Sequence, residues 1–203
     1  MKKYLTRLTP NTKGWQYPSG CECKCGGELY ENTYDFGWEE WLFNKRNRKE
    51  DFQYGFLQCF NSQNKNEEVT YDEVYLYTRK CKTKDKDCKN KSKKGNCFLI
   101  ARLYNVKKLS LEEANEMQDE FCNNGKIKQM NDECSNKVAF ELGPNKNKLI
   151  FNVKFKIEDA KLIDKEVIII PGNYHFIMVN IENSQKRNSI INSINQSSFN
   201  QNI

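Results

Sequence analysis

The sequence predicts an α+β domain, built as a small, mixed and partly open β-barrel with peripheral helices. Three observations predict this fold class. At least five segments have the composition or alternation of β-strands, one segment carries the start and stop signals of a helix, and 12% aromatic residues supply a core. A chain of 203 residues accommodates about one domain. We assign residues 1–183 to this domain and read the Asn- and Ser-rich residues 184–203 as a tail or linker.

The strand predictions rest on β-branched and aromatic composition or on alternation of apolar and polar residues. The run Phe98–Ala101 is continuously apolar, which indicates a strand that is buried on both faces. Leu149, Phe151, Val153 and Phe155 alternate with other residues, as on a half-buried strand. The predicted strands cover residues 52–58, 74–78, 97–106, 149–155, 167–170 and 174–181.

Two helices are predicted, one from its cap and one from its aromatic spacing. Ser110 followed by Glu113 matches a capping box, and Gly125 is a stop signal, so a helix is expected up to about Asn123. Trp38 and Trp41 are three residues apart, which places them on one face of a short helix. Residues 1–35 and the Lys-rich residues 79–96 are expected to be irregular, and residues 157–162 to form one helical turn.

The composition restricts the chemistry. His175 is the one histidine, so sites that need histidine together with specific partners are disfavoured and a binding module is favoured. A net charge of +6 is compatible with nucleic acid as a partner. No apolar run reaches the length of a membrane span, and residues 1–10 lack a continuous apolar segment, so we expect a cytoplasmic protein without a membrane partner.

The nine cysteines form one local cluster that suits a metal. Cys21, Cys23 and Cys25 are close enough in sequence for a structural zinc, but a second pair with knuckle spacing is missing. The odd count also argues against a disulfide framework. Reduced thiols and no cofactor are therefore the expectation, with zinc at this cluster as the alternative.

Three blocks of the sequence resemble a known class of modules. They are Phe36–Asn44 (FGWEEWLFN), Tyr54–Gln58 (YGFLQ) and Phe151–Ala160 (FNVKFKIEDA). Together they resemble N-terminal modules of modification-dependent restriction proteins that are fused to HNH-type or other nuclease domains. Such modules are similar to the PUA superfamily, which includes the EVE, ASCH and SRA domains. The resemblance covers about residues 4–181 and implies a pseudo-barrel that reads a modified base flipped out of duplex DNA.

The resemblance implies a base pocket lined by aromatic and polar side chains, with basic residues on its rim. The cysteine cluster and the Lys-rich residues 81–94 depart from that pattern. The main alternative for Trp38 and Trp41 is packing in the core, and for the basic residues a solvated loop. The pocket candidates are Trp15, Phe36, Trp38, Glu39, Trp41, Asn44 and Tyr54, and the phosphate-binding candidates are Arg46, Arg48 and Lys49.

The expected function is therefore recognition of a modified base in duplex DNA, by base flipping, in a restriction or defence system. The chain has no predicted catalytic centre, so a fused or separate nuclease subunit is the expected partner, with methylated DNA as the ligand. The alternatives are an RNA-binding PUA-like module, a protein-interaction domain, and a metal-dependent nuclease that uses Asp159 and Lys161.

Overall fold

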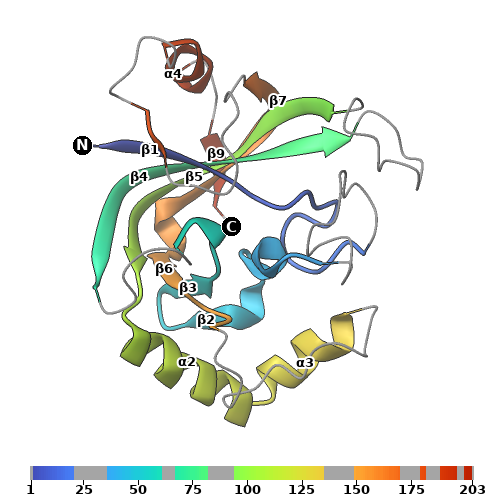
Figure 1. Cartoon of the computed structure of the whole chain (residues 1–203), viewed down its shortest axis with the longest axis vertical. Coiled ribbons are helices and arrows are strands. Elements are labelled where there is room, and N and C mark those ends of the chain that lie inside the picture. Colours follow the sequence, from blue (N-terminus) through green and yellow to red (C-terminus); the bar gives the residue numbers. More distant parts are fainter. Residues whose placement is uncertain are drawn as a thin grey trace.

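A computed structural model shows the fold. It describes residues 2–20, 36–60, 67–81, 94–134, 149–169, 179–181, 188–195 and 199–202. Its centre is a long antiparallel pair, β4 (Val69–Cys81) and β5 (Lys94–Lys108). The pairing shifts register at two places, after Leu76 and after Arg79, and both strands bend strongly (Figure 1). Bulges of this kind increase the bend and twist of a strand, so the two ends of the pair face different parts of the molecule.

The other strands extend this pair into one sheet. On the β4 side, β1 (Lys3–Arg7) runs parallel to β4, and β8 (Val179–Asn180) pairs with β1. On the β5 side, β6 (Val153–Lys156) pairs with one end of β5, and β7 (Ala160–Ile169) pairs with the other end. Beyond β6, the sheet continues through β3 (Phe52–Gly55) to β2 (Arg48–Lys49). Beyond β7, it continues to β9 (Phe199–Asn202).

Within the described residues the sheet does not close. Its strand order is β2-β3-β6-β5-β4-β1-β8, with β7 and β9 branching from β5, and all neighbours are antiparallel except β1 and β4. The predicted α+β class with an open sheet is confirmed at this level.

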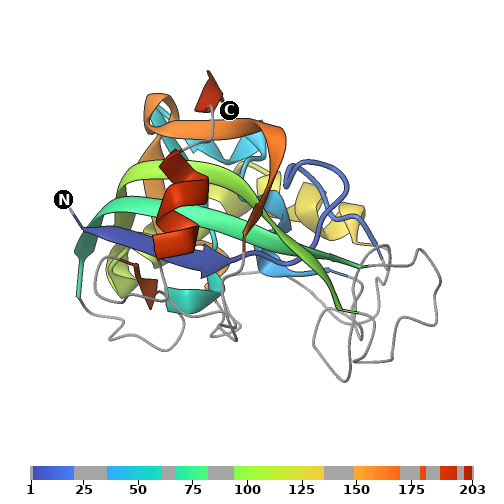
Figure 2. The ribbon, with the colours of Figure 1, turned by 90° about the horizontal axis from the view of Figure 1, so that it is seen from above.

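Helices lie at both ends of the molecule (Figure 1). The pair α2 (Leu111–Asn123) and α3 (Lys126–Glu133) covers one end, and α4 (Asn188–Asn195) lies across strands at the other (Figure 2). Among the described residues, four 3₁₀ turns lie between strands: η1 (Trp38–Trp41), η2 (Lys45–Asn47), η3 (Gln58–Phe60) and η5 (Ile157–Asp159). No helix among the described segments has the length and apolarity needed to span a membrane.

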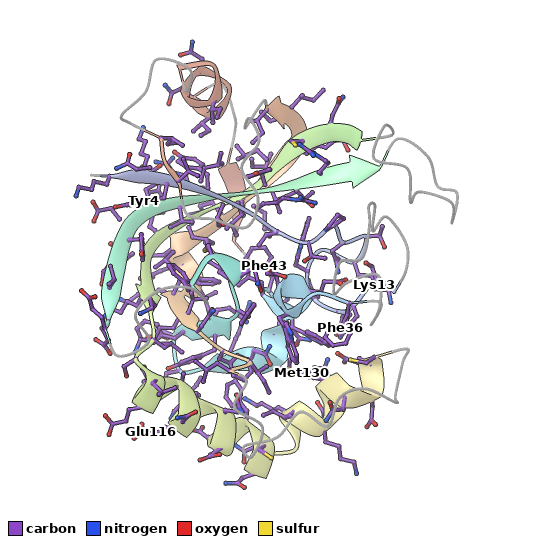
Figure 3. All side chains as sticks on the ribbon, in the orientation of Figure 1. Tyr4, Lys13, Phe36, Phe43, Glu116 and Met130 are labelled. Carbon is purple, nitrogen blue, oxygen red and sulfur yellow. The ribbon has the colours of Figure 1, made fainter. Side chains whose placement is uncertain are left out.

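The core consists of three hydrophobic clusters. The first fills the inside of the bent sheet and includes Leu42, Leu76 and Leu103. The second joins η1 to α2 and α3, and Figure 3 shows Phe36 near Met130 of α3. The third lies under α4 on the other face of β4 and β5. Successive strand residues point to opposite faces, so Tyr75 belongs to the third cluster and Leu76 to the first.

The helix at residues 111–123 is confirmed, with a modified cap. Ser110 is its N-cap, and the Glu113 N–H donates to Ser110 Oγ at 3.2 Å. The Glu113 carboxylate contacts Lys154 Nζ of β6. The predicted turn at residues 157–162 is the shorter η5, after which β7 begins at Ala160.

Several elements differ from the sequence predictions. β1 lies inside the segment expected to be irregular, and α3 was not expected. Within the expected tail, the described residues 188–195 and 199–202 carry secondary structure: α4 packs Ile190 and Ile194 into the third cluster, and β9 pairs with β7. Cys21, Cys23, Cys25, His175 and residues 82–93 lie outside the described residues.

Candidate nucleic-acid interface

The aromatic block 36–44 forms the turn η1, and Gly37 is required where it begins. A Cβ built on Gly37 would lie 2.3 Å from Thr9 Oγ1 and 2.8 Å from Thr9 Cβ. These distances are too short for any larger residue without a shift of Thr9. The turn is therefore held tightly against the N-terminal segment, and the direction of the following side chains is fixed.

Glu40 connects this turn to the N-terminal segment. Its carboxylate is fully buried and accepts hydrogen bonds from Gly37 N–H at 2.8 Å and from Asn11 Nδ2 at 2.7 Å. The backbone N–H and the hydroxyl of Ser19 donate to it at 2.7 and 2.9 Å. A buried carboxylate needs such donors, because its charge has lost water. Glu40 thus serves the structure of residues 11–19.

Glu39 points to a different set of partners. Its Oε2 accepts a hydrogen bond from Thr9 Oγ1 at 2.9 Å, and the side chain is buried. Together with burial, which is the larger cause, its charge raises the pKa of the Cys59 thiol to about 12. Cys59 is therefore a protonated core thiol rather than a nucleophile.

The predicted pocket aromatics divide between two clusters. Trp15 belongs to the first, and its indole N–H donates to the Thr9 carbonyl at 2.9 Å. Phe36, Trp41 and Tyr54 are buried in the second, and Trp41 Nε1 donates to Glu133 Oε2 at 2.7 Å. Burial is the main cause that raises the pKa of Tyr54 to about 12. These four side chains are placed as core residues in the structure.

Trp38 is the predicted pocket residue that stays half-buried. Its ring lies edge-on to Phe36, with 5.3 Å between the centroids. The rings of Trp41 and Phe56 are both 6.4 Å away. Three buried rings therefore support one partly accessible indole, whose position follows from the rigid η1 turn.

Asn44, the last pocket candidate, is a buried cap residue. Its side-chain oxygen accepts from the Arg46 N–H at 2.9 Å and so caps η2. Its amide donates to the Gln16 carbonyl at 2.6 Å. This geometry links η2 to the N-terminal segment.

The three phosphate-binding candidates all contact acceptors of the protein. Arg46 contacts Glu133 and lies 3.1 Å from Gln129 Oε1, and Arg48 Nε donates to Gln53 at 3.2 Å. Lys49 Nζ lies 2.6 Å from Glu120, and this hydrogen bond is the main cause that raises the pKa of Lys49. Their exposed parts remain accessible to a ligand, but the charge of Lys49 is partly balanced by Glu120 of α2 and that of Arg46 by Glu133 of α3.

Tyr17 contacts one of the phosphate-binding candidates. It is 42% exposed, and the Arg46 guanidinium carbon lies 5.3 Å from its ring centroid. The Glu133 carboxylate contacts both Arg46 and the Trp41 indole, so Tyr17, Arg46, Trp41 and Trp38 form a continuous series. We call the three members that are not buried, Tyr17, Arg46 and Trp38, the Trp38 surface, and the buried Trp41 links them through Glu133.

The described residues offer little for metal chemistry. They contain no group of three or more His, Cys, Asp and Glu side chains arranged for a metal ion. Asp159 accepts from Asn105 Nδ2 at 3.3 Å, and Lys161 lies opposite Arg102 in the β5–β7 pair. The cysteines whose side chains are described, Cys59, Cys97, Cys122 and Cys134, are thiols.

Comparisons with known proteins give no relative. No family model, no curated protein and no solved structure matches the chain.

Proposed function

We propose that the chain is a nucleic-acid-binding module of the PUA-like class that recognises a modified base in duplex DNA, without a catalytic centre of its own. The observation that carries the proposal is the half-buried Trp38 on its support of Phe36, Trp41 and Phe56. An indole held in this way can stack on a flipped base without losing further conformational freedom. Stacking restores part of the free energy that flipping costs.

Arg46 of the Trp38 surface and the lysines that flank this surface in sequence suit a polyanion. Arg46 is stacked on Tyr17. Two exposed lysines are close to this pair in sequence: Lys45 directly precedes Arg46, and Lys13 is four residues before Tyr17. The face of α2 is opposite in character, because Glu112, Glu116 and Asp119 are exposed and the helix has no basic residue. Figure 3 shows Glu116 pointing away from the sheet. DNA is therefore expected to approach the Trp38 surface and to avoid the outer face of α2.

The test compares one duplex without modification and with 5-methylcytosine, 5-hydroxymethylcytosine or N6-methyladenine, at low and at moderate salt. We expect a preference for one modified duplex that persists at moderate salt, because stacking and base contacts depend less on salt than phosphate contacts do. Equal, salt-sensitive binding of all four duplexes would contradict base recognition. Preference for a single-stranded or structured RNA of equal length would favour the RNA-binding alternative.

Variants of Trp38 locate the contact. Trp38→Ala should weaken binding of the preferred duplex by about 1–3 kcal/mol, the value of one base–aromatic stack. Trp38→Phe should restore most of this loss. The matched control is Leu111→Ala, which removes another partly exposed apolar side chain, 37% exposed on α2. Full binding by Trp38→Ala, with an unchanged thermal unfolding curve, would exclude this tryptophan as the base contact.

A further inference from the structure

Arg102 of β5 is held from several sides on the face of the sheet that carries the third cluster. Its Nε lies 2.5 Å from Glu73 Oε1 on the neighbouring strand β4. Its guanidinium carbon lies 4.4 Å from the ring centroid of Tyr104 and 5.7 Å from that of Tyr75. Stacking and an ion pair together fix the plane of the guanidinium group.

Glu73 is the unusual member of this group. Its side chain is completely buried, and the Tyr75 hydroxyl donates to the same oxygen that contacts Arg102. The second oxygen, Oε2, has no hydrogen-bond partner among the described residues. Buried ion pairs add little to stability, because removing both charges from water costs as much as the pair returns. The evident effect of Glu73 is therefore to orient Arg102, whose side chain remains 26% exposed.

A second cation lies beside Arg102. Lys161 of β7 is its direct partner in the β5–β7 pair, so both side chains emerge on the same face. Directly opposite residues have Cβ atoms roughly 5 Å apart. Next to them, Asn105 has a left-handed backbone with φ of 50° and donates to Asp159 at 3.3 Å.

We propose that Arg102 and Lys161 form a binding site for a phosphoryl group. A planar, oriented guanidinium can donate two parallel hydrogen bonds to phosphate oxygens. A phosphate monoester has about two negative charges and three acceptor oxygens, so it can contact both cations at once, whereas a carboxylate offers one charge. The site lies on the opposite sheet face from the first cluster and does not depend on Trp38.

The test uses the full chain and inorganic phosphate as the probe. The NMR signal of the Arg102 Nε–Hε group is followed during titration with phosphate, and with acetate and chloride at matched ionic strength. We expect a saturable shift with phosphate alone. Lys161→Gln should weaken phosphate binding about tenfold, as expected for loss of one charge-assisted contact. The matched control is Lys107→Gln, an exposed lysine of β5, the strand that carries Arg102, and it should change binding less than about twofold.

Arg102→Lys provides a second variant that keeps a cation beside Glu73 but loses the planar donor pair. It should also weaken phosphate binding about tenfold, while its circular dichroism spectrum stays that of the unaltered chain. Equal effects of Lys161→Gln and Lys107→Gln, or equal shifts with phosphate and chloride, would overturn the site.

The source of the phosphoryl group is distinguished with two further probes, a nucleoside monophosphate and a single-stranded oligonucleotide of the same base. Tighter binding of the monophosphate would indicate a free nucleotide, and tighter binding of the oligonucleotide would indicate a nucleic-acid backbone. Either result should survive Trp38→Ala, which separates this site from the Trp38 surface.

Discussion

The two adjacent carboxylates of η1 show how neighbouring residues acquire separate roles. Glu39 faces Thr9, whereas Glu40 faces Gly37, Asn11 and Ser19. Carboxylates that diverge in this way cannot share a proton or a metal ion, as their positions on a turn predict. Their shared effect is structural, because both fasten the N-terminal segment to the turn that presents Trp38.

Replacing Glu40 by alanine should therefore destabilise the fold strongly. The change leaves the buried Gly37 and Ser19 donors without their acceptor, and each unsatisfied donor costs about 1–3 kcal/mol. We expect a loss of roughly 3 kcal/mol or more in the free energy of unfolding, measured with urea. Glu116→Ala on the exposed face of α2 is the control and should stay within about 0.5 kcal/mol. Equal midpoints for the two variants would contradict this role of Glu40.

The sequence identified the aromatic block but not which of its members would be accessible. Spacing placed Trp38 and Trp41 on one face, and packing was the main alternative to a pocket. The difference between them depends on distant residues: Trp41 is covered partly by Glu133, which is 92 positions later. No local pattern encodes such a contact, so burial of Trp15, Phe36 and Tyr54 was equally out of reach.

Among the elements, α2 was predictable and α3 was not. Ser110 and Glu113 give α2 a local start signal, and the structure has the Ser110 half of this capping box. Gly125 signals the end of α2, yet with φ of 71° it is also the N-cap of α3. An eight-residue helix with two buried apolar residues, Ile127 and Met130, has too little periodicity to be recognised. Its packing against η1 stabilises it.

The helix α4 shows the same dependence on tertiary contacts. Its sequence, NSIINSIN, combines residues of poor helix propensity with isoleucine, and composition alone predicts a tail. Ile190 and Ile194 lie four positions apart and are both buried against the third cluster. The sheet face below them supplies the apolar surface that the local sequence does not reveal.

Ile194→Ala distinguishes a packed helix from a tail. Removing this buried side chain should lower the free energy of unfolding by about 2–4 kcal/mol, because a cavity remains beneath α4. Denaturant unfolding measures the change, with Leu111→Ala on α2 as the partly exposed control that should cost far less. An unchanged midpoint for Ile194→Ala would instead support the prediction that residues 184–203 form a tail.

At the scale of the whole molecule, tyrosines in two clusters link stability to alkaline pH. Burial, the largest cause, raises the pKa of Tyr54 and of Tyr77 to about 12. Burial and the neighbouring Glu73 raise the pKa of Tyr75 as well. All three therefore stay protonated in the folded chain at a pH where the unfolded chain, with a pKa of 10.0, has lost these protons.

The sign of the effect follows from linkage. A raised pKa in the folded state gives stability that is complete below pH 10 and is lost as pH rises through about 12. We expect the free energy of unfolding to fall across this window, with tyrosinate absorbance appearing together with loss of circular dichroism. Tyr54→Phe removes one of these groups and should make the fall shallower. A free energy of unfolding that stays constant across the window would contradict this coupling.

The position of β1 sets an order for the assembly of the sheet. The strand β1 lies between β4 and β8. One of its edges can therefore pair after residues 73–77 have been synthesised, and the other edge can pair only after residues 179–180 have been synthesised. The central hairpin of β4 and β5, in contrast, joins segments that are close in the chain. During synthesis the hairpin can therefore form early, while β1, which is made before it, is enclosed only after residues 179–180 have been made. Contacts of such long sequence separation slow folding, so β1 is the strand whose edge stays open longest.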